Sequence, residues 1–196
     1  MTVLDCLEMI RLTQDRGLMY RHSCHHSACG TCAVRMNGVE RLACVTRVAE
    51  LDSEIITLEP LNGFPPIADL VVDMTAFYAD IDSHWSCLKP SNTPAEAALN
   101  PGEKPLRLED CIECGCCVSV CPVVAGGDEF MGPAALAALS NQLSKTPQER
   151  VELLARAGVP RGEPRCRRAL DCSRICPTKV YPARHIAELR RIREKG

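Results

Sequence analysis

The sequence lacks three features that would point to common classes of function. It has 23 basic and 25 acidic residues among 196, so there is no basic excess of the kind that binds a nucleic-acid backbone. No uninterrupted apolar run approaches the roughly 20 residues that a membrane-spanning helix needs. The first residues carry neither a secretory apolar segment nor an Arg-rich transit pattern. We therefore expect a chain that is cytosolic, or peripheral on a cytosolic membrane face.

Cysteine, by contrast, is abundant, with fourteen residues in the chain. Cytosolic thiols are kept reduced, so cysteines at regular spacings indicate metal binding or catalysis rather than a disulfide scaffold. A hydrophobic fraction of 46% is normal for a globular protein. The length allows one ordinary domain or two small ones.

The first third of the chain predicts a small domain of mixed α and β structure. Thr2, followed three residues later by Asp5, is typical of a helix N-cap with a carboxylate in the first turn. The apolar residues that follow have helical spacing, and we expect a helix from Val3 to about Gln14.

A β-hairpin is predicted next. Two short apolar runs, Ala33–Met36 and Val39–Leu42, are separated by Asn37-Gly38, the strongest two-residue hairpin signal. Both central positions of a type I′ turn need positive φ, which Asn and Gly tolerate. A further strand is expected over Ile55–Leu58.

After Pro65-Pro66 the pattern becomes helical, and we place a domain boundary there, dividing the chain into residues 1–66 and 67–196. The predicted helices cover residues 67–82, 133–143, 147–157 and a last segment that starts at Pro182. The third has a near-complete start and stop signature, with Thr146 as N-cap and Gly158 just past its end. The whole is an α+β fold.

The first set of cysteines is Cys24, Cys29, Cys32 and Cys44. The pattern C-x4-C-x2-C with a distant fourth cysteine is the plant-type two-iron (2Fe-2S) spacing. In the predicted hairpin register Cys32 stands opposite Ala43, so Cys44 lies next to Cys32 in space. This explains how a fourth ligand can be distant in sequence.

Two other readings of this set are weaker. His25 and His26 in the same loop allow a Rieske-type centre with histidine ligands, but four cysteines already fill the ligand set at the right spacing. A four-cysteine zinc site usually has two C-x2-C pairs instead. Gly30 and the small residues Ser27 and Ala28 let backbone amides approach the cluster sulfurs.

The second set is the most specific signal in the sequence. Cys111, Cys114, Cys117 and Cys121-Pro122 follow C-x2-C-x2-C-x3-C-P, the run of bacterial ferredoxins. In that run three cysteines bind one cluster and the fourth binds a second cluster, so another half-motif should exist downstream. It does, in the form C-x5-C-x3-C-P at Cys166, Cys172 and Cys176-Pro177.

The crossover rule assigns the ligands of both clusters. Cys176 completes a four-iron (4Fe-4S) centre with Cys111, Cys114 and Cys117. The other centre has the ligands Cys121, Cys166 and Cys172. Its missing cysteine aligns with Ala169, whose methyl group cannot bind iron, so we predict a three-iron (3Fe-4S) cluster. A fourth iron held by an exogenous ligand stays open as an alternative.

Three cysteines remain outside these sets. We expect Cys6 to be a core residue of the first helix, because free cysteine is among the most buried residue types. Cys116 sits one position off the ligand period and is predicted to be a neighbour of the cluster rather than a ligand. Cys87 has no assigned role.

With these motifs, nearly the whole chain resembles the iron–sulfur subunits of succinate:quinone and quinol:fumarate oxidoreductases. Beyond the cysteines, the resemblance includes Arg21-His22-Ser23-Cys24, Arg41-Leu42-Ala43-Cys44, Asp69-Leu70-Val71-Val72-Asp73 and Gly132-Pro133-Ala134-Ala135-Leu136. It implies a plant-type ferredoxin (β-grasp) domain followed by an all-α domain like a bacterial ferredoxin.

The resemblance also implies a function and partners. Electrons would pass from covalent FAD on a flavoprotein subunit through the two-iron, four-iron and three-iron clusters to quinone beside membrane anchor subunits. The chain itself would do no bond chemistry. It would be peripheral on the cytoplasmic face of the bacterial inner membrane, in the tricarboxylic acid cycle or in fumarate reduction.

Two departures from the family pattern matter. Relatives usually begin with a strand hairpin, whereas here Met1 directly precedes the helix cap, so we expect a β-grasp domain without its first hairpin and a truncated start. Gly126 and Arg167 stand where some members have a tryptophan and a histidine near quinone. Pro122 and Arg167 are the candidates for the quinone vicinity here.

Two other functions keep the same clusters. One is the iron–sulfur subunit of another flavoprotein complex, such as a thiol-driven fumarate reductase or a related dehydrogenase. The other is a free ferredoxin-like carrier, which the size and the two-domain build disfavour, because a simple carrier needs only one of these modules.

Overall fold

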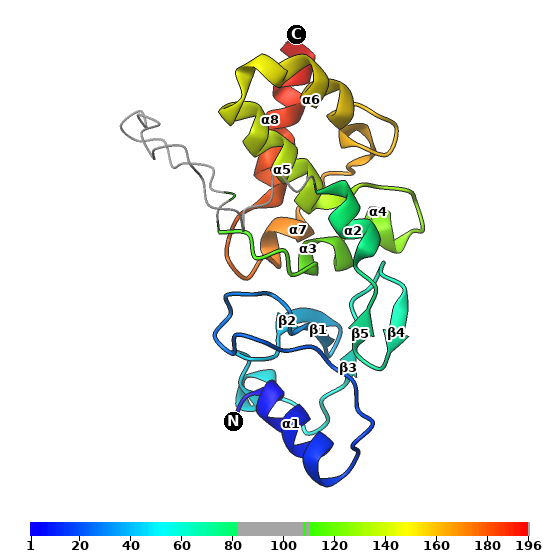
Figure 1. The fold of residues 1–196 in the computed structure, drawn as a ribbon, viewed down its shortest axis with the longest axis vertical. Helices are drawn as coiled ribbons and strands as arrows, with labels where there is room; N and C mark the ends of the chain where they lie inside the picture. Colours follow the sequence, from blue (N-terminus) through cyan, green and yellow to red (C-terminus); the bar gives the residue numbers. More distant parts are fainter. Residues whose placement is uncertain (82–107, 109, 196) are drawn as a thin grey trace, which may run out of the picture.

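The computed structural model describes residues 1–81, 108 and 110–195. Figure 1 shows the N-terminal helix and the strands at one end of an elongated molecule and the C-terminal helices at the other. The short helix α3 (Cys116–Ser119) faces the strands at the junction and contacts β2 (Val39–Leu42). The N-terminal and C-terminal parts therefore meet at an element that carries one predicted cluster ligand, Cys117.

Helix α1 (Val3–Thr13) forms as predicted. The amide of Asp5 donates to the hydroxyl of Thr2 at 3.2 Å, and the amide of Thr2 donates back to the Asp5 carboxylate at 2.7 Å. This reciprocal capping box satisfies two backbone donors at the helix start. The helix buries Val3, Leu4 and Leu7 in the N-terminal core, whereas Cys6, expected in that core, is only half-buried.

The predicted hairpin is confirmed. Strands β1 (Ala33–Met36) and β2 pair antiparallel with Met36 opposite Val39, and the turn residues Asn37 and Gly38 both have positive φ. Strand β3 (Leu58–Glu59) adds to the other side of β1, giving the order β2-β1-β3.

The predicted strand over Ile55–Leu58 is wrong except at its last residue. Ile55 is exposed, and strand pairing starts at Leu58, directly after Thr57, which the turn residue Asn37 holds. The Asn37 side chain accepts from the Thr57 amide at 2.8 Å, and the Asn37 amide donates to the Thr57 carbonyl at 2.9 Å. The turn therefore sets where the third strand begins.

The helix predicted over residues 67–82 is wrong for most of its length. Strands β4 (Pro66–Ala68) and β5 (Val71–Val72) form a small hairpin there, and helix α2 (Thr75–Asp80) follows. Residue 82 lies outside the described residues. Asp69 in the turn has φ +43, and its carboxylate accepts from the Met19 amide at 2.7 Å. A contact with a residue fifty positions away thus overrides the local helical spacing.

The C-terminal part is all helical in the described residues. Its elements are α3, α4 (Pro122–Ala125), α5 (Gly132–Lys145), α6 (Arg150–Ala157), α7 (Asp171–Arg174) and α8 (Pro182–Lys195), with 3₁₀ turns η2 (Pro147–Glu149) and η3 (Glu163–Arg165). A further 3₁₀ turn, η1 (Val48–Leu51), lies in the N-terminal part. Helices α5 and α8 pack together and bury Leu136, Leu139 and Leu189. This pair forms the core that supports the cysteine loops.

The helix predicted over 147–157 begins later than expected. Its first turn is 3₁₀ and the α-helix starts at Arg150, whereas the predicted stop at Gly158 is confirmed. The Thr146 hydroxyl lies 3.1 Å from both the Gln142 carbonyl and the Glu149 carboxylate. Because the hydroxyl turns back to α5 as a donor, it does not cap the amides of the new helix.

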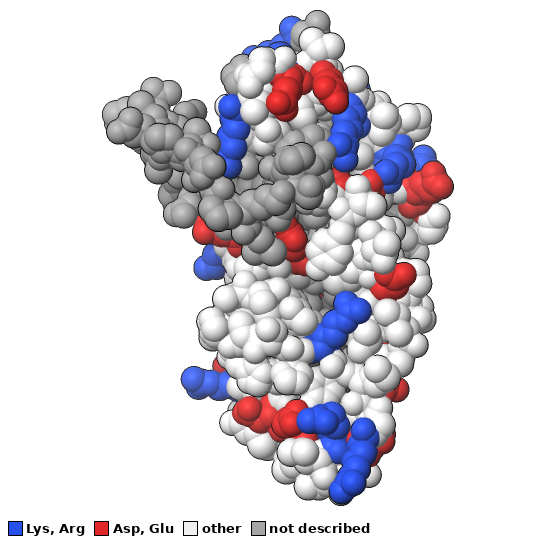
Figure 2. Space-filling view, viewed as in Figure 1, with Lys and Arg blue, Asp and Glu red and all other residues white. Residues whose placement is uncertain are grey.

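Surface charge follows the balanced composition. Acidic and basic side chains are interspersed on the face drawn in Figure 2 rather than gathered by sign. Among the described helices, none has both the length and the apolar character that crossing a bilayer requires.

Candidate iron–sulfur centres

The first cysteine group gathers around the β1–β2 hairpin. The Ala43 amide donates to the Cys32 carbonyl at 3.1 Å, so the antiparallel register continues past the strand ends. This brings Cys44 beside Cys32, where the two thiols interact. Burial raises the pKa of Cys32 to about 12. A thiol in this position becomes a thiolate when a metal takes the place of its proton.

The loop before β1 directs backbone amides at the sulfurs. Cys24 Sγ accepts from the amides of His26, Ala28 and Cys29 at 3.5, 3.2 and 3.3 Å. Cys44 Sγ accepts from the amide of Ser27 at 3.4 Å. The hydrogen bond from His26 is the largest cause that lowers the pKa of Cys24 to about 7. Positive φ at His25 and Ser27 gives the loop the concave shape of an anion-binding nest.

The two histidines of this loop have other partners. The Nδ1 atom of His26 contacts the Cys24 carbonyl, and the Nε2 atom of His25 lies 2.9 Å from Nδ1 of His22. One ring nitrogen of each histidine is thus occupied by a contact within the loop or beside it.

The second cysteine group lines a small cavity of about 20 Å³ between α3 and the loop before α8. Its members are Cys111, Cys114, Cys117 and Cys176. Burial first, and then the neighbouring thiols, raise the pKa of Cys117 well above its usual value. The Val180 amide donates to Cys176 Sγ at 3.3 Å. Glu113 and Gly115 have positive φ, which turns the chain sharply between the cysteines.

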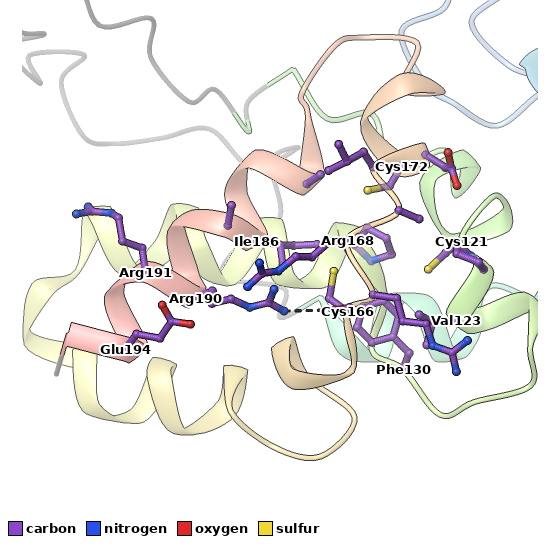
Figure 3. Close-up of a pocket in the computed structure, with 18 residues that line it drawn as sticks. Cys121, Val123, Phe130, Cys166, Arg168, Cys172, Ile186, Arg190, Arg191 and Glu194 are labelled. Atoms are coloured by element: carbon purple, nitrogen blue, oxygen red, sulfur yellow. Dashed lines mark hydrogen bonds between the residues drawn. The ribbon is translucent and has the colours of Figure 1, made fainter.

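The third cysteine group lines a larger cavity of about 300 Å³, shown in Figure 3. Cys121, Cys166 and Cys172 converge there, and Ala169 lines the same cavity. Burial, followed by the two neighbouring thiols, raises the pKa of Cys172 to about 11. Pro122 also lines this cavity, as does Arg167, whose guanidinium is ion-paired with Asp128 at 2.9 Å.

Sequence reasoning missed a buried ion-pair cluster beside the third group. Glu163, 2% exposed, pairs with both Arg190 and Arg193 of α8. Arg190 also donates to the carbonyls of Glu163 and Cys166, each at 3.3 Å, the latter contact being the dashed line in Figure 3. The spacing of Glu163 from Arg190 in sequence gave no signal of this contact.

Two of the remaining cysteines can be located against their predictions. Cys116 is 1% exposed, packs in the N-terminal core and contacts Cys114, as expected of a neighbour. Cys87 lies outside the described residues.

The three groups stand in series. Gly30, beside Cys29 of the first group, packs against Cys114 of the second. Helix α3, which carries Cys117 of the second group, in turn contacts α7, which carries Cys172 of the third. Cysteines from distant segments therefore form a row from the strands into the helical part.

The donor set fits iron–sulfur clusters. Each group consists of thiols, and amides reach sulfurs of the first and second groups, the pattern that such clusters use. Within residues 1–81, 108 and 110–195, no three His, Cys, Asp or Glu side chains are arranged to hold a single metal ion. A cluster places several irons and sulfides between its ligands and so needs a wider ring of thiols than one ion does.

Comparison with known proteins identifies the family. A model described as "2Fe-2S iron-sulfur cluster binding domain" matches residues 1–79, and a "4Fe-4S dicluster domain" matches residues 107–180. The succinate dehydrogenase iron–sulfur subunit of Coxiella burnetii is 34% identical, with 96% of this chain and 82% of the relative covered. The mitochondrial subunit of Candida glabrata is 31% identical, covering 96% and 78%.

A solved structure gives the same result at the level of the fold. A chain from a structure titled "Mycobacterium smegmatis Sdh1 complex in the apo form" superposes with a TM-score of 0.73 and 26% identity. The superposition covers 99% of this chain and 84% of the other. The protein thus belongs to the family of succinate dehydrogenase iron–sulfur subunits.

Proposed function

We propose that this chain relays electrons, within a succinate dehydrogenase or fumarate reductase complex, between covalent FAD on a flavoprotein subunit and a membrane quinone. The proposed ligands are Cys24, Cys29, Cys32 and Cys44 for 2Fe-2S, Cys111, Cys114, Cys117 and Cys176 for 4Fe-4S, and Cys121, Cys166 and Cys172 for 3Fe-4S. Bound clusters supply one-electron steps between two-electron partners. The observation that carries the proposal is the unbroken row of three thiol groups.

The chain's own residues support this role by holding the groups and limiting access of water. Cys32, Cys117 and Cys172 are buried enough that burial is the main cause of their raised thiol pKa. Amides donate to Cys24 in the first group and to Cys176 in the second. Hydrogen bonding and burial are the two protein levers that set cluster potential.

The quinone is proposed to approach at the third group. The cavity there is open to solvent, and Pro122 and Arg167 line it. A site at this end implies that membrane anchor subunits lie against the helical part, which would make the chain peripheral on the cytoplasmic face of the membrane. The division into residues 1–66 and 67–196 and the missing first hairpin stay predictions.

One observation favours a second candidate with another flavoprotein partner and another acceptor. The guanidinium of Arg167 is ion-paired with Asp128 at 2.9 Å, so part of its hydrogen-bonding capacity is already used within the chain. A thiol-driven fumarate reductase or a related dehydrogenase would need no quinone at this position.

The clusters are tested on the full chain, loaded anaerobically, by metal analysis and low-temperature electron paramagnetic resonance (EPR). We expect about nine irons per chain, a three-iron signal in the oxidised state and a two-iron signal on reduction. Zinc in place of iron, or an oxidised sample without a signal, contradicts the assignment.

The partners are tested on material purified from cells. Copurification with a subunit carrying covalent FAD, together with succinate-dependent reduction of a quinone analogue, is the expected result. Dye reduction without quinone reduction favours the second candidate, and a stable monomer without any partner favours a free carrier.

A further inference from the structure

A buried carboxylate sits at the junction between the two parts of the chain. Glu40 lies on β2, in the hairpin that carries Cys32 and Cys44, and is 5% exposed. An ionised carboxylate removed from water is costly unless it is paired and hydrogen-bonded. Its partners therefore show what the residue does.

Glu40 is held by one residue from each part of the molecule. Arg35, its cross-strand neighbour on β1, places Nε 3.7 Å from the carboxylate. Ser119, at the end of α3 and 2% exposed, donates its hydroxyl to the same carboxylate oxygen at 2.8 Å. The second contact crosses the junction.

The contacts close into a ring. The Asn62 amide donates to Ser119 Oγ at 2.8 Å, and Arg35 Nη1 donates to Asn62 Oδ1 at 3.3 Å. Arg35, Glu40 and Asn62 belong to the N-terminal part, and Ser119 closes the ring from the helical part. We call these four residues the junction ring.

The position of the ring in the sequence links it to the cysteine groups. Ser119 stands two residues after Cys117 of the second group and two before Cys121 of the third. Glu40 stands on the hairpin whose ends hold two first-group ligands. Figure 1 shows α3 directly facing β1 and β2. A shift between Ser119 and Glu40 therefore shifts one set of thiols against another.

We propose that Glu40 and Ser119 are positioning residues that fix the separation of the first and second cysteine groups, and thereby the electron step between them. The effect on the electron step rests on the proposed function, whereas the docking of the two parts through the junction ring does not. Hydrogen bonds to a charged group are among the stronger ones in proteins, and inside a closed network each partner holds the next.

The test compares Ser119→Ala, Ser119→Thr and Glu40→Gln in the loaded full-length chain. Ser119→Ala removes the hydroxyl, Ser119→Thr keeps it, and Glu40→Gln keeps the shape while removing the charge. Ser140→Ala is the matched control, because Ser140 is a buried serine of α5.

Two readouts separate docking from overall stability. The first is hydrogen exchange of the Asn62 backbone amide, which donates to Ser119 Oγ. We expect this exchange to become about tenfold faster or more in Ser119→Ala. The second is microwave-power saturation of the two-iron EPR signal with the second cluster reduced. A larger separation weakens the magnetic coupling, so the signal should saturate at lower power.

Ser119→Thr should restore both readouts, Glu40→Gln should fall between, and Ser140→Ala should match the parent chain. Unchanged Asn62 exchange and unchanged saturation in Ser119→Ala would overturn the inference, as would an equal effect in Ser140→Ala. If the parent chain lacks the two-iron and four-iron signals, the proposed function fails. The exchange of Asn62 in Glu40→Gln then still decides whether the ring docks the two parts, because that variant leaves the acceptor of the Asn62 backbone amide, Ser119 Oγ, in place.

Discussion

Gly30 packs against Cys114 so closely that a side chain at Gly30 has no room. A Cβ added at Gly30 would stand 2.7 Å from the Cβ of Cys114 and 2.5 Å from the carbonyl oxygen of Ile112. Gly30 also has φ +69, in the region that side chains rarely adopt. This contact is where the loop of the first cysteine group meets the second.

We therefore expect Gly30→Ala to destabilise the loaded chain by about 3 kcal/mol, through backbone strain and the clash with an immobile backbone. The measurement is urea unfolding under anaerobic conditions, together with the two-iron EPR signal. Gly127→Ala is the control, since Gly127 has φ +76 but open space around it. It should cost only about 1 kcal/mol. Equal losses in the two variants would contradict a specific contact at Gly30.

The ion-pair cluster of Glu163 predicts that the third cysteine group can be destabilised more than the first. Glu163→Gln leaves Arg190 and Arg193 partly buried without their counter-charge, and breaking a buried pair costs about 3–5 kcal/mol. Because Arg190 also holds the Cys166 carbonyl, the three-iron EPR signal should be lost at lower urea than the two-iron signal.

The control for this prediction is Glu188→Gln. Glu188 pairs with Arg191 on the surface of α8, where the two side chains are 33% and 55% exposed. An exposed pair of this kind contributes about 1 kcal/mol or less. Loss of both EPR signals at the same urea concentration would show that the cluster stabilises the fold generally rather than the third group.

The local parts of the fold were predictable because short-range chemistry decides them. The capping box of Thr2 and Asp5 defines the start of α1, and Asn37-Gly38 defines the hairpin. The thiol groups were likewise predictable in outline, since the register that sets Cys32 opposite Ala43 follows from the turn alone.

The residues after Pro66 were not predictable in the same way. Leu70 and Phe77 have the spacing of one helical face, but they pack into two different cores. Only the folded chain brings Asp69 to the Met19 amide, and that contact fixes the β4–β5 turn. The junction ring and the cluster of Glu163 could not be predicted for the same reason. Their partners are distant in sequence, and each member is an ordinary charged or polar residue in its local sequence.

Acidification should loosen α1 through Glu8. Hydrogen bonds from Arg11 and then Tyr20 lower the pKa of the Glu8 carboxyl below its usual 4.5. A carboxyl whose folded-state pKa is lowered stabilises the fold above its unfolded-state pKa, and that stability is lost as pH falls through the folded-state pKa. The thermal midpoint of the parent chain should therefore fall as pH drops below about 4.5.

Glu8→Gln should show a smaller fall over the same pH range, because the amide does not titrate. The same substitution at the exposed Glu54 is the control and should leave the pH dependence of the parent chain in place. Identical curves for the parent chain and Glu8→Gln would exclude a contribution from this hydrogen-bonded carboxylate.

Ala169→Cys tests why the third cysteine group should hold three irons. Ala169 occupies the aligned position of the missing cysteine and lines the cavity with Cys121, Cys166 and Cys172. A fourth thiolate there supplies the ligand that a fourth iron needs. We expect the iron content to rise by about one per chain and the signal of the oxidised three-iron state to disappear.

Ala187→Cys places a thiol in the same cavity from α8, outside the motif, and should leave both measurements unchanged. If the parent chain already contains about ten irons, an exogenous ligand holds the fourth iron and the substitution adds none. If Ala169→Cys keeps the three-iron signal at unchanged iron content, the crossover alignment that pairs Ala169 with the missing ligand is wrong.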